Sequence, residues 1–170
     1  MDGGPDSEPP PAARGRALET LTRPLAVAGG LLSLAAAAMV VTSVLLRWLT
    51  VHSVPGDIEL VQIATGLSIF AFLPLCQAQR GNIMVDTFTT WLPARAQRGL
   101  DALWDVVYAC AAAVIAWRLA VGAADTIRSH TVSMMLGLPI GWVIAACAVM
   151  AALLMVVALA TAWRLVRGRR

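Results

Sequence analysis

Residues 136–163 read LGLPIGWVIAACAVMAALLMVVALATAW and contain no charged side chain. A helix rises about 1.5 Å per residue and a bilayer core is about 30 Å thick, so about 20 apolar residues suffice to cross it. This run is longer than that, and we expect its helix to tilt or to project beyond the membrane. Because hydrocarbon cannot hydrogen-bond to backbone groups, the run is predicted to be helical.

Three further apolar runs precede it, at about 25–48, 58–78 and 103–123. The chain has 170 residues, of which 59% are hydrophobic and only 14% charged, a balance that is unusual for a soluble domain. The predicted fold class is an all-α membrane protein, with four transmembrane helices in one domain over residues 25–163.

The distribution of arginine predicts the orientation of these spans. All 13 basic residues are arginines, and they concentrate in the N-terminal segment, the second connection and the C-terminal tail. The first and third connections hold only Arg47 and Arg128. Basic residues favour the cytoplasmic side, so both termini are predicted to be cytoplasmic. The three groups are Arg14, Arg16 and Arg23; Arg80, Arg95 and Arg98; and Arg164, Arg167, Arg169 and Arg170.

The two ends of the chain differ from the spans in composition. Residues 1–24 are rich in proline, glycine and charge, which predicts a disordered cytoplasmic arm leading into a short helical entry. A signal peptide is the alternative, but the arm carries acidic residues and the apolar run continues well beyond any cleavage site. Residues 164–170 are predicted to form a basic cytoplasmic tail.

The second connection, CQAQRGNIMVDTFTTWLP at residues 76–93, is half apolar and half polar. Asn82 suits a helix N-cap, Asp86 suits a first turn, and Pro93 ends the pattern. This spacing predicts a short amphipathic helix in the headgroup region, with an ordinary loop as the alternative. The apolar side chains recur at i, i+4 and i+7, as Met84, Phe88 and Trp91.

Few charges lie inside the runs. Arg118 is the one clearly internal charge, and we expect it to extend toward the outer interface or to pair with Glu59 or Asp125. Arg47 and Glu59 flank the first outer connection. They are interpreted either as an ion pair that fixes the first hairpin or presents charge to an external partner, or as two solvated charges.

Small residues form stripes that favour close helix contacts. The stripes do not distinguish a partner within the chain from one outside it. They are Gly137, Gly141 and Ala145 on the fourth span, and Ala112, Ala116, Ala120 and Ala124 on the third.

The cysteines and histidines predict no catalytic, metal or cofactor site. Cys76, Cys110 and Cys147 lie far apart inside apolar runs and are interpreted as small buried hydrophobes. His52 and His130 lie in or beside outer connections, where they cannot ligate a haem between spans. Nucleic-acid binding is not expected, because the arginines separate apolar runs instead of forming a basic face.

Three motifs resemble those of the small membrane subunit of TRAP (tripartite ATP-independent periplasmic) transporters. They are LLRW with PGDIELVQI at residues 45–63, FLPLCQAQRGNIMVDTFTTWLP at 72–93, and SMMLGLPIGW at 133–142. The resemblance covers about residues 25–163. The family often has histidine where Asn82 stands, so any role that needs an imidazole there is absent.

The resemblance implies a bacterial inner-membrane system of three parts. A periplasmic solute-binding protein captures an organic acid, and a large many-span permease subunit moves it, driven by an ion gradient that is usually sodium. The small subunit braces the large one within the lipid bilayer, and its outer charges are candidate contacts for the binding protein. The structural or partner-contact candidates are Arg47, Glu59, Arg80, Asn82, Asp86, Trp91, Arg118, Gly137 and Gly141.

Two other functions stay open at this point. One is a self-sufficient, homo-oligomeric small transporter, which would place Glu59 or Arg118 in a central path. The other is a membrane-bound redox or enzyme subunit, which would need a cofactor.

Overall fold

The computed structural model describes residues 13–50, 55–79 and 94–166. Within them the chain forms four helices, each containing a stretch that is long and apolar enough to cross a membrane. The prediction of an all-helical, four-span fold is confirmed. The helices are α1 (Ala13–Thr50), α2 (Asp57–Ala78), α3 (Ala94–Arg128) and α4 (Ile140–Val166).

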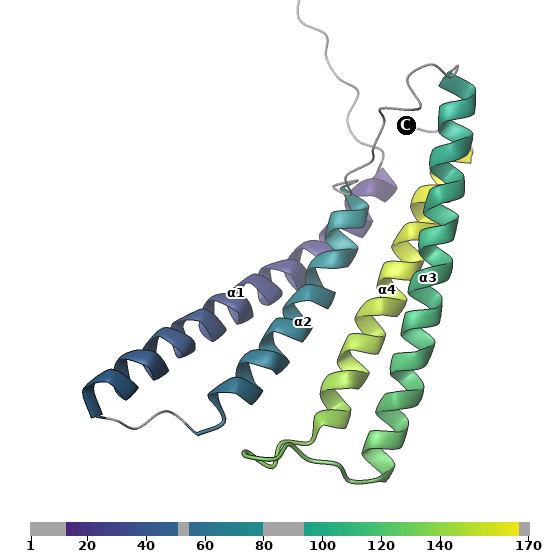
Figure 1. Ribbon diagram of the computed structural model, residues 1–170. Helices are drawn as coiled ribbons and strands as arrows, with labels where there is room; N and C mark the ends of the chain where they lie inside the picture. Colours follow the sequence, from purple (N-terminus) through teal and green to yellow (C-terminus); the bar gives the residue numbers. More distant parts are fainter. Residues whose placement is uncertain (1–12, 51–54, 80–93, 167–170) are drawn as a thin grey trace, which may run out of the picture.

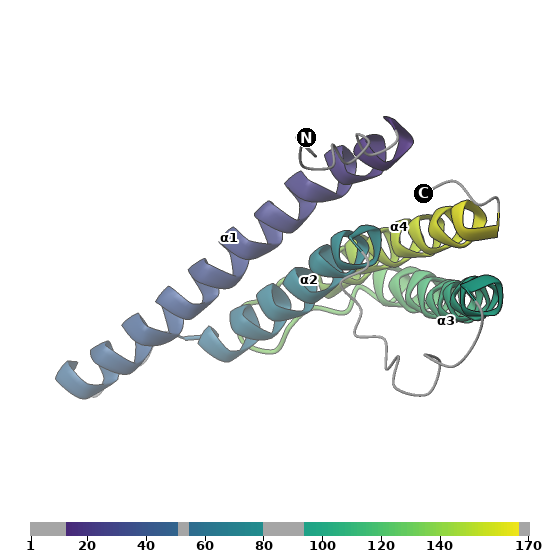
Figure 2. The same ribbon diagram turned by 90° about the horizontal axis from the view of Figure 1, so that it is seen from above.

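The helices lie in the order α1, α2, α4, α3 (Figures 1 and 2). α1 packs on α2, α2 packs on α4, and α4 packs most extensively on α3. The molecule therefore consists of two helical hairpins, α1–α2 and α3–α4, joined along the contact between α2 and α4. Figure 1 shows α1 leaning away from α2 toward the end where α2 begins.

Buried side chains recur in steps of three and four along the first half of α3 and along one row of α4, and Ala148, Val157 and Ala162 are buried beside that row. This average spacing of about 3.5 residues is typical of helices packed side by side at a shallow angle. Most of these residues are alanines, which let the two backbones approach closely. They are Ala102, Asp105, Ala109 and Ala112 on α3, and Cys147, Ala151, Leu154, Ala158 and Thr161 on α4.

This contact corrects the predicted alanine stripe on α3. Ala112 is buried and Ala116 is half-buried, but Ala120 and Ala124 are exposed. A strict four-residue step advances about 40° around a helix of 3.6 residues per turn at each repeat. The stripe therefore turns away from α4, and only its first half lies in the contact.

The predicted stripe on the fourth span is also only partly right. Gly141 is buried in the first turn of α4, and a Cβ there would lie 2.6 Å from Cγ1 and 3.1 Å from the backbone nitrogen of Ile127. Gly137 is not on the helix at all, because α4 begins at Ile140. It lies in the α3–α4 connection with a φ of 65°, a left-handed conformation that glycine adopts without strain.

The helices α1 and α3 are longer than the apolar spans predicted from the sequence. α1 begins at Ala13, before the predicted start of the first span at residue 25, and α3 extends from Ala94 to Arg128. Residues 1–12, most of the second connection (80–93) and residues 167–170 lie outside the described residues. The predicted interfacial helix therefore remains a prediction.

Candidate functional site

The carboxylate of Glu59, in the first turn of α2, binds the connection between α3 and α4. Its Oε2 accepts hydrogen bonds from the Ser133 hydroxyl at 2.7 Å and from the Leu136 backbone N–H at 3.1 Å. Its Oε1 accepts one from the Met135 N–H at 2.8 Å. We call these residues, Glu59, Ser133, Met135 and Leu136, the Glu59 clasp. It ties the start of α2, in the α1–α2 hairpin, to the turn of the α3–α4 hairpin.

Two glycines make the shape of this clasp possible. Gly56 precedes α2 with a φ of 76°, and a Cβ there would lie 2.5 Å from Cγ of Leu136. The Leu136 side chain thus occupies the space beside the start of α2 that any other residue would fill. Gly137 donates its N–H to the Ser133 carbonyl at 3.2 Å, and Ser133 donates its own N–H to the Leu138 carbonyl at 2.9 Å.

A second polar cluster joins three helices at the opposite end of α2. The Gln77 amide Nε2 donates to Asp105 Oδ1 on α3 at 2.9 Å and to Thr161 Oγ1 on α4 at 3.3 Å. The Thr161 hydroxyl in turn donates to the Ala158 carbonyl at 2.7 Å. We call Gln77, Asp105 and Thr161 the Gln77 clasp. Its three residues are 2%, 6% and 5% exposed, so their polar groups must find hydrogen-bond partners within the protein.

Hydrogen bonds also fasten α1 to α2 at two levels. The Ser68 hydroxyl donates to the Gly29 carbonyl at 2.9 Å, where a Cβ on Gly29 would lie 2.8 Å from Cβ of Ala71. Nearer the other end, the Ser43 hydroxyl donates to Asp57 Oδ2 at 2.5 Å. The first contact is a close backbone crossing, and the second is a polar bond at the start of α2.

Comparison with known families decides the identity of the chain. The family model described as "Tripartite ATP-independent periplasmic transporters, DctQ component" matches residues 36–168, which include the last part of α1 and all of α2, α3 and α4. The chain belongs to this family. It is thus a multi-pass member of the small permease subunits of TRAP transporters, which are transporter components and not enzymes. No curated protein sequence matches the chain, and no solved structure matches it.

The predicted partnership of Arg47 with Glu59 is not found in this DctQ-family chain. Both Glu59 oxygens bind the α3–α4 connection, whereas Arg47 is exposed and attracts the carboxylate of Asp57. Glu59 is thus neither paired with Arg47 nor freely solvated, whereas the exposed position of Arg47 agrees with a solvated charge and leaves a contact with an external partner as a prediction.

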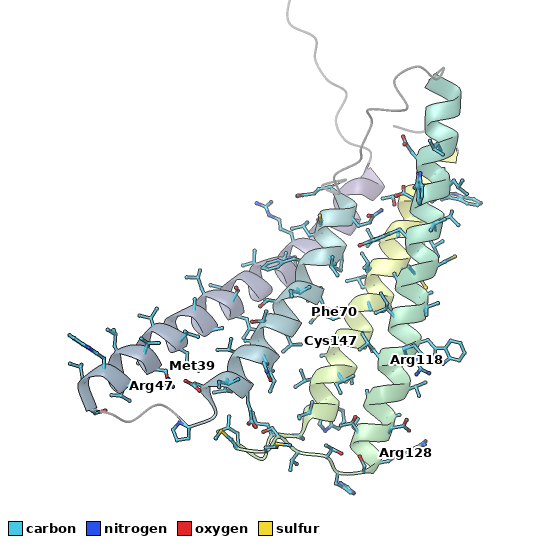
Figure 3. All side chains as sticks on the ribbon, in the orientation of Figure 1. Met39, Arg47, Phe70, Arg118, Arg128 and Cys147 are labelled. Carbon is cyan, nitrogen blue, oxygen red and sulfur yellow. The ribbon has the colours of Figure 1, made fainter. Side chains whose placement is uncertain are left out.

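Arg118 is exposed, and Figure 3 shows it on the side of α3 that faces away from α4. It does not pair with Glu59, which is held by the connection, and Asp125 is itself exposed. This placement suits extension of the guanidinium along the membrane toward the interface. The other predicted candidates, Arg80, Asn82, Asp86 and Trp91, lie outside the described residues.

Sequence reasoning missed the partners that make the clasps. Neither Gln77 nor Asp105 was among the candidate residues, and nothing in the sequence analysis joined the two. The positions of Asp105 and Thr161 could have indicated these partners. Both residues fall on the three–four pattern of buried residues, where a polar side chain must find a hydrogen-bond partner.

Proposed function

We propose that the chain is the accessory small permease subunit of a secondary-active TRAP transporter, and that it braces the large membrane subunit. The observation that carries the proposal is the pair of clasps. Gln77 follows Glu59 by 18 positions on α2, which is about 27 Å of helix. The two hairpins are thus hydrogen-bonded together at both ends of α2, with apolar packing between.

The polar side chains in the helix contacts support a bracing role. Ser43, Ser68, Gln77 and Thr161 are all buried, and each hydrogen-bonds to another helix or to the backbone of its own. Residues 60–76, between the clasps, carry no charge. Polar groups used to fasten helices together are typical of a scaffold, whereas a transport path directs such groups into a cavity.

The faces left for the large subunit are on the outer helices. α1 packs mainly on α2, and α3 packs mainly on α4. Each presents a continuous apolar surface along most of its length. Prominent exposed residues are Leu31, Leu34, Val41, Leu45 and Leu49 on α1, and Leu103, Val107, Val114 and Trp117 on α3. We propose that the large permease subunit covers part of this surface in the bacterial inner membrane.

The remaining parts of the proposal rest on the family and on arginine asymmetry. In this proposal both termini lie in the cytoplasm, as the arginine asymmetry favours, and the Glu59 clasp faces the periplasm. Exposed charges at that end, Arg47, Asp125 and Arg128, are candidate contacts for the periplasmic binding protein. The substrate class is an organic acid, and the driving force is an ion gradient, with sodium as the proposed coupling ion.

Reconstitution tests this function. The tagged chain is co-expressed with the large permease subunit of its own system, purified, and placed in vesicles with a sodium gradient and the binding protein. We expect the large subunit to co-purify, and uptake to require all three components. Solute accumulation by the chain alone would instead show a self-sufficient transporter, and full uptake by the large subunit without this chain would exclude a bracing role.

A matched pair of variants links the test to the clasps. Gln77→Leu removes the donor at the centre of the Gln77 clasp, whereas Gln62→Leu makes the same change at an exposed position of the same helix. We expect the first to reduce recovery of the complex and uptake severalfold, and the second to leave both unchanged. Equal recovery and uptake for the two variants would show that the Gln77 clasp is not needed for the proposed function.

A further inference from the structure

The α3–α4 connection presents an apolar surface at its most exposed point. Met134 is fully exposed, Met135 is 72% exposed and Val132 is about half exposed, whereas Leu136 packs beside Gly56 and is only partly accessible. We call residues 132–136 the apolar tip. A loop that projects into water usually carries polar residues, so these side chains need a different environment.

The tip is held rigidly, and its depth is fixed by the helix that holds it. Glu59 accepts backbone N–H groups from Met135 and Leu136 directly, so the tip lies at the level of the first turn of α2. Gln77 marks the far end of the uncharged part of α2, about 27 Å away along the helix. A hydrocarbon core about 30 Å thick that contains this segment therefore ends close to the level of the tip.

Neighbouring side chains fit the same level. Ile58 is exposed in the first turn of α2 beside Glu59, and Trp142 is exposed in the first turn of α4. Tryptophan is enriched where hydrocarbon meets headgroups. Arg118, less than three turns before the end of α3, is exposed and long enough to reach toward this boundary. The apolar tip thus continues a belt of residues suited to the interface.

We propose that the apolar tip inserts Met134 and Met135 into the phospholipid leaflet at this end of the molecule, at the boundary between headgroups and acyl chains. The Glu59 clasp positions the tip for this contact. Unbranched, flexible methionine side chains suit an irregular and fluid surface, and a tip whose backbone is already ordered loses little conformational freedom when it inserts. The tip therefore sets the depth of the α3–α4 hairpin in the membrane.

Depth-dependent fluorescence quenching tests this proposal. In a background with Cys76→Ala, Cys110→Ala and Cys147→Ala, a single Met134→Cys is labelled with bimane and the full chain is placed in phosphatidylcholine–phosphatidylglycerol vesicles. Quenching is measured with aqueous iodide and with lipids that carry nitroxide at the headgroup or at set depths on the acyl chain. Val149→Cys, exposed on α4 nine residues after its start, is the deep control. Bimane-labelled glutathione is the aqueous control.

We expect iodide to quench the Met134 probe severalfold less than bimane-glutathione, and shallow acyl nitroxides to quench it more than deep ones. The Val149 probe should show the reverse order of depths. Iodide quenching equal to that of bimane-glutathione, with no lipid quenching, would overturn the proposal. Shielding that appears only after the large subunit or the binding protein is added would also overturn it and assign the tip to a protein contact. Because quenching is first measured with this chain alone in vesicles, the result does not depend on the proposed transport function.

Discussion

The Glu59 clasp and the Gln77 clasp perform the same mechanical task with different chemistry. At the Glu59 clasp a half-buried carboxylate binds backbone N–H groups of a loop. At the Gln77 clasp an almost fully buried amide joins side chains of two other helices. A loop has free N–H groups to offer a carboxylate, whereas helices in a closed contact have none and must use side chains. A carboxylate therefore suits the end where the partner is a loop, and a side-chain amide suits the end where the partners are helices.

The comparison predicts that the buried clasp is the more costly one to break. Gln77→Leu keeps the volume but leaves the Asp105 carboxylate buried without its donor, at a cost of about 3 kcal/mol in the free energy of unfolding. SDS titration in mixed micelles measures this value. Gln62→Leu, exposed on the same helix, should change it by less than about 0.5 kcal/mol.

Removing both partners should recover part of this loss. In the double variant Gln77→Leu with Asp105→Leu, no unpaired carboxylate remains, and Thr161 keeps its bond to the Ala158 carbonyl. The double variant should therefore be more stable than Gln77→Leu alone, by about 1–2 kcal/mol. The single variant Asp105→Leu completes the comparison. If the stability losses of Gln77→Leu and Asp105→Leu simply add in the double variant, Gln77 and Asp105 are not energetically coupled, and the clasp does not exist as described.

Close packing near the Glu59 clasp should have the next largest effect. Gly141→Ala places a methyl group against the backbone nitrogen of Ile127, at a cost of about 1–3 kcal/mol from overpacking. Gly66→Ala is the matched control, because nothing lies within 4 Å of its added Cβ. It should be neutral or stabilising by about 0.5–1 kcal/mol, the difference in helix preference between the two residues. Thermal unfolding in detergent compares the two variants, and equal shifts would exclude the close contact.

Removing the charge of Glu59 should lower the free energy of unfolding less than removing the Gln77 donor, because water can reach the half-buried Glu59 clasp. Glu59→Gln turns one acceptor into a donor that faces N–H groups, so we expect a loss of about 1–2 kcal/mol. Amide hydrogen exchange at Met135 and Leu136 should accelerate. Asp125→Asn, an exposed change of the same type, should leave those amides as slow as in the parent chain.

The smallest effect is expected where α1 meets α2. Ser43→Ala removes one hydrogen bond to Asp57, which keeps the Ile58 N–H as a donor and the attraction of Arg47. The loss should be about 1 kcal/mol or less, seen as a small shift in the SDS midpoint. A loss as large as that of Gln77→Leu would show that α1 is as firmly fastened as the clasps.

The number of spans could be predicted from the sequence because the bilayer imposes it: four runs are long, apolar and separated by charges or turns. The pairing of helices could not, since a span that is apolar on all sides gives no signal for its contact face. Gly137 and Gly141 show the difficulty, for both fit a four-residue stripe, yet Gly137 is needed for a turn. Gln77 was missed because a polar residue at the end of a run fits an interfacial position equally well. Its partners are 28 and 84 positions away.

The central claim is that the two clasps hold the hairpins together as one rigid unit, and a distance measurement tests it most directly. Spin labels at Ile69→Cys on α2 and Ile115→Cys on α3, both exposed, report the spacing of the hairpins in the cysteine-free background. The account predicts one narrow distance distribution by double electron–electron resonance, broadened by Gln77→Leu and unchanged by Gln62→Leu. A distribution that is already broad in the parent chain, or that stays narrow with Gln77→Leu, would contradict it.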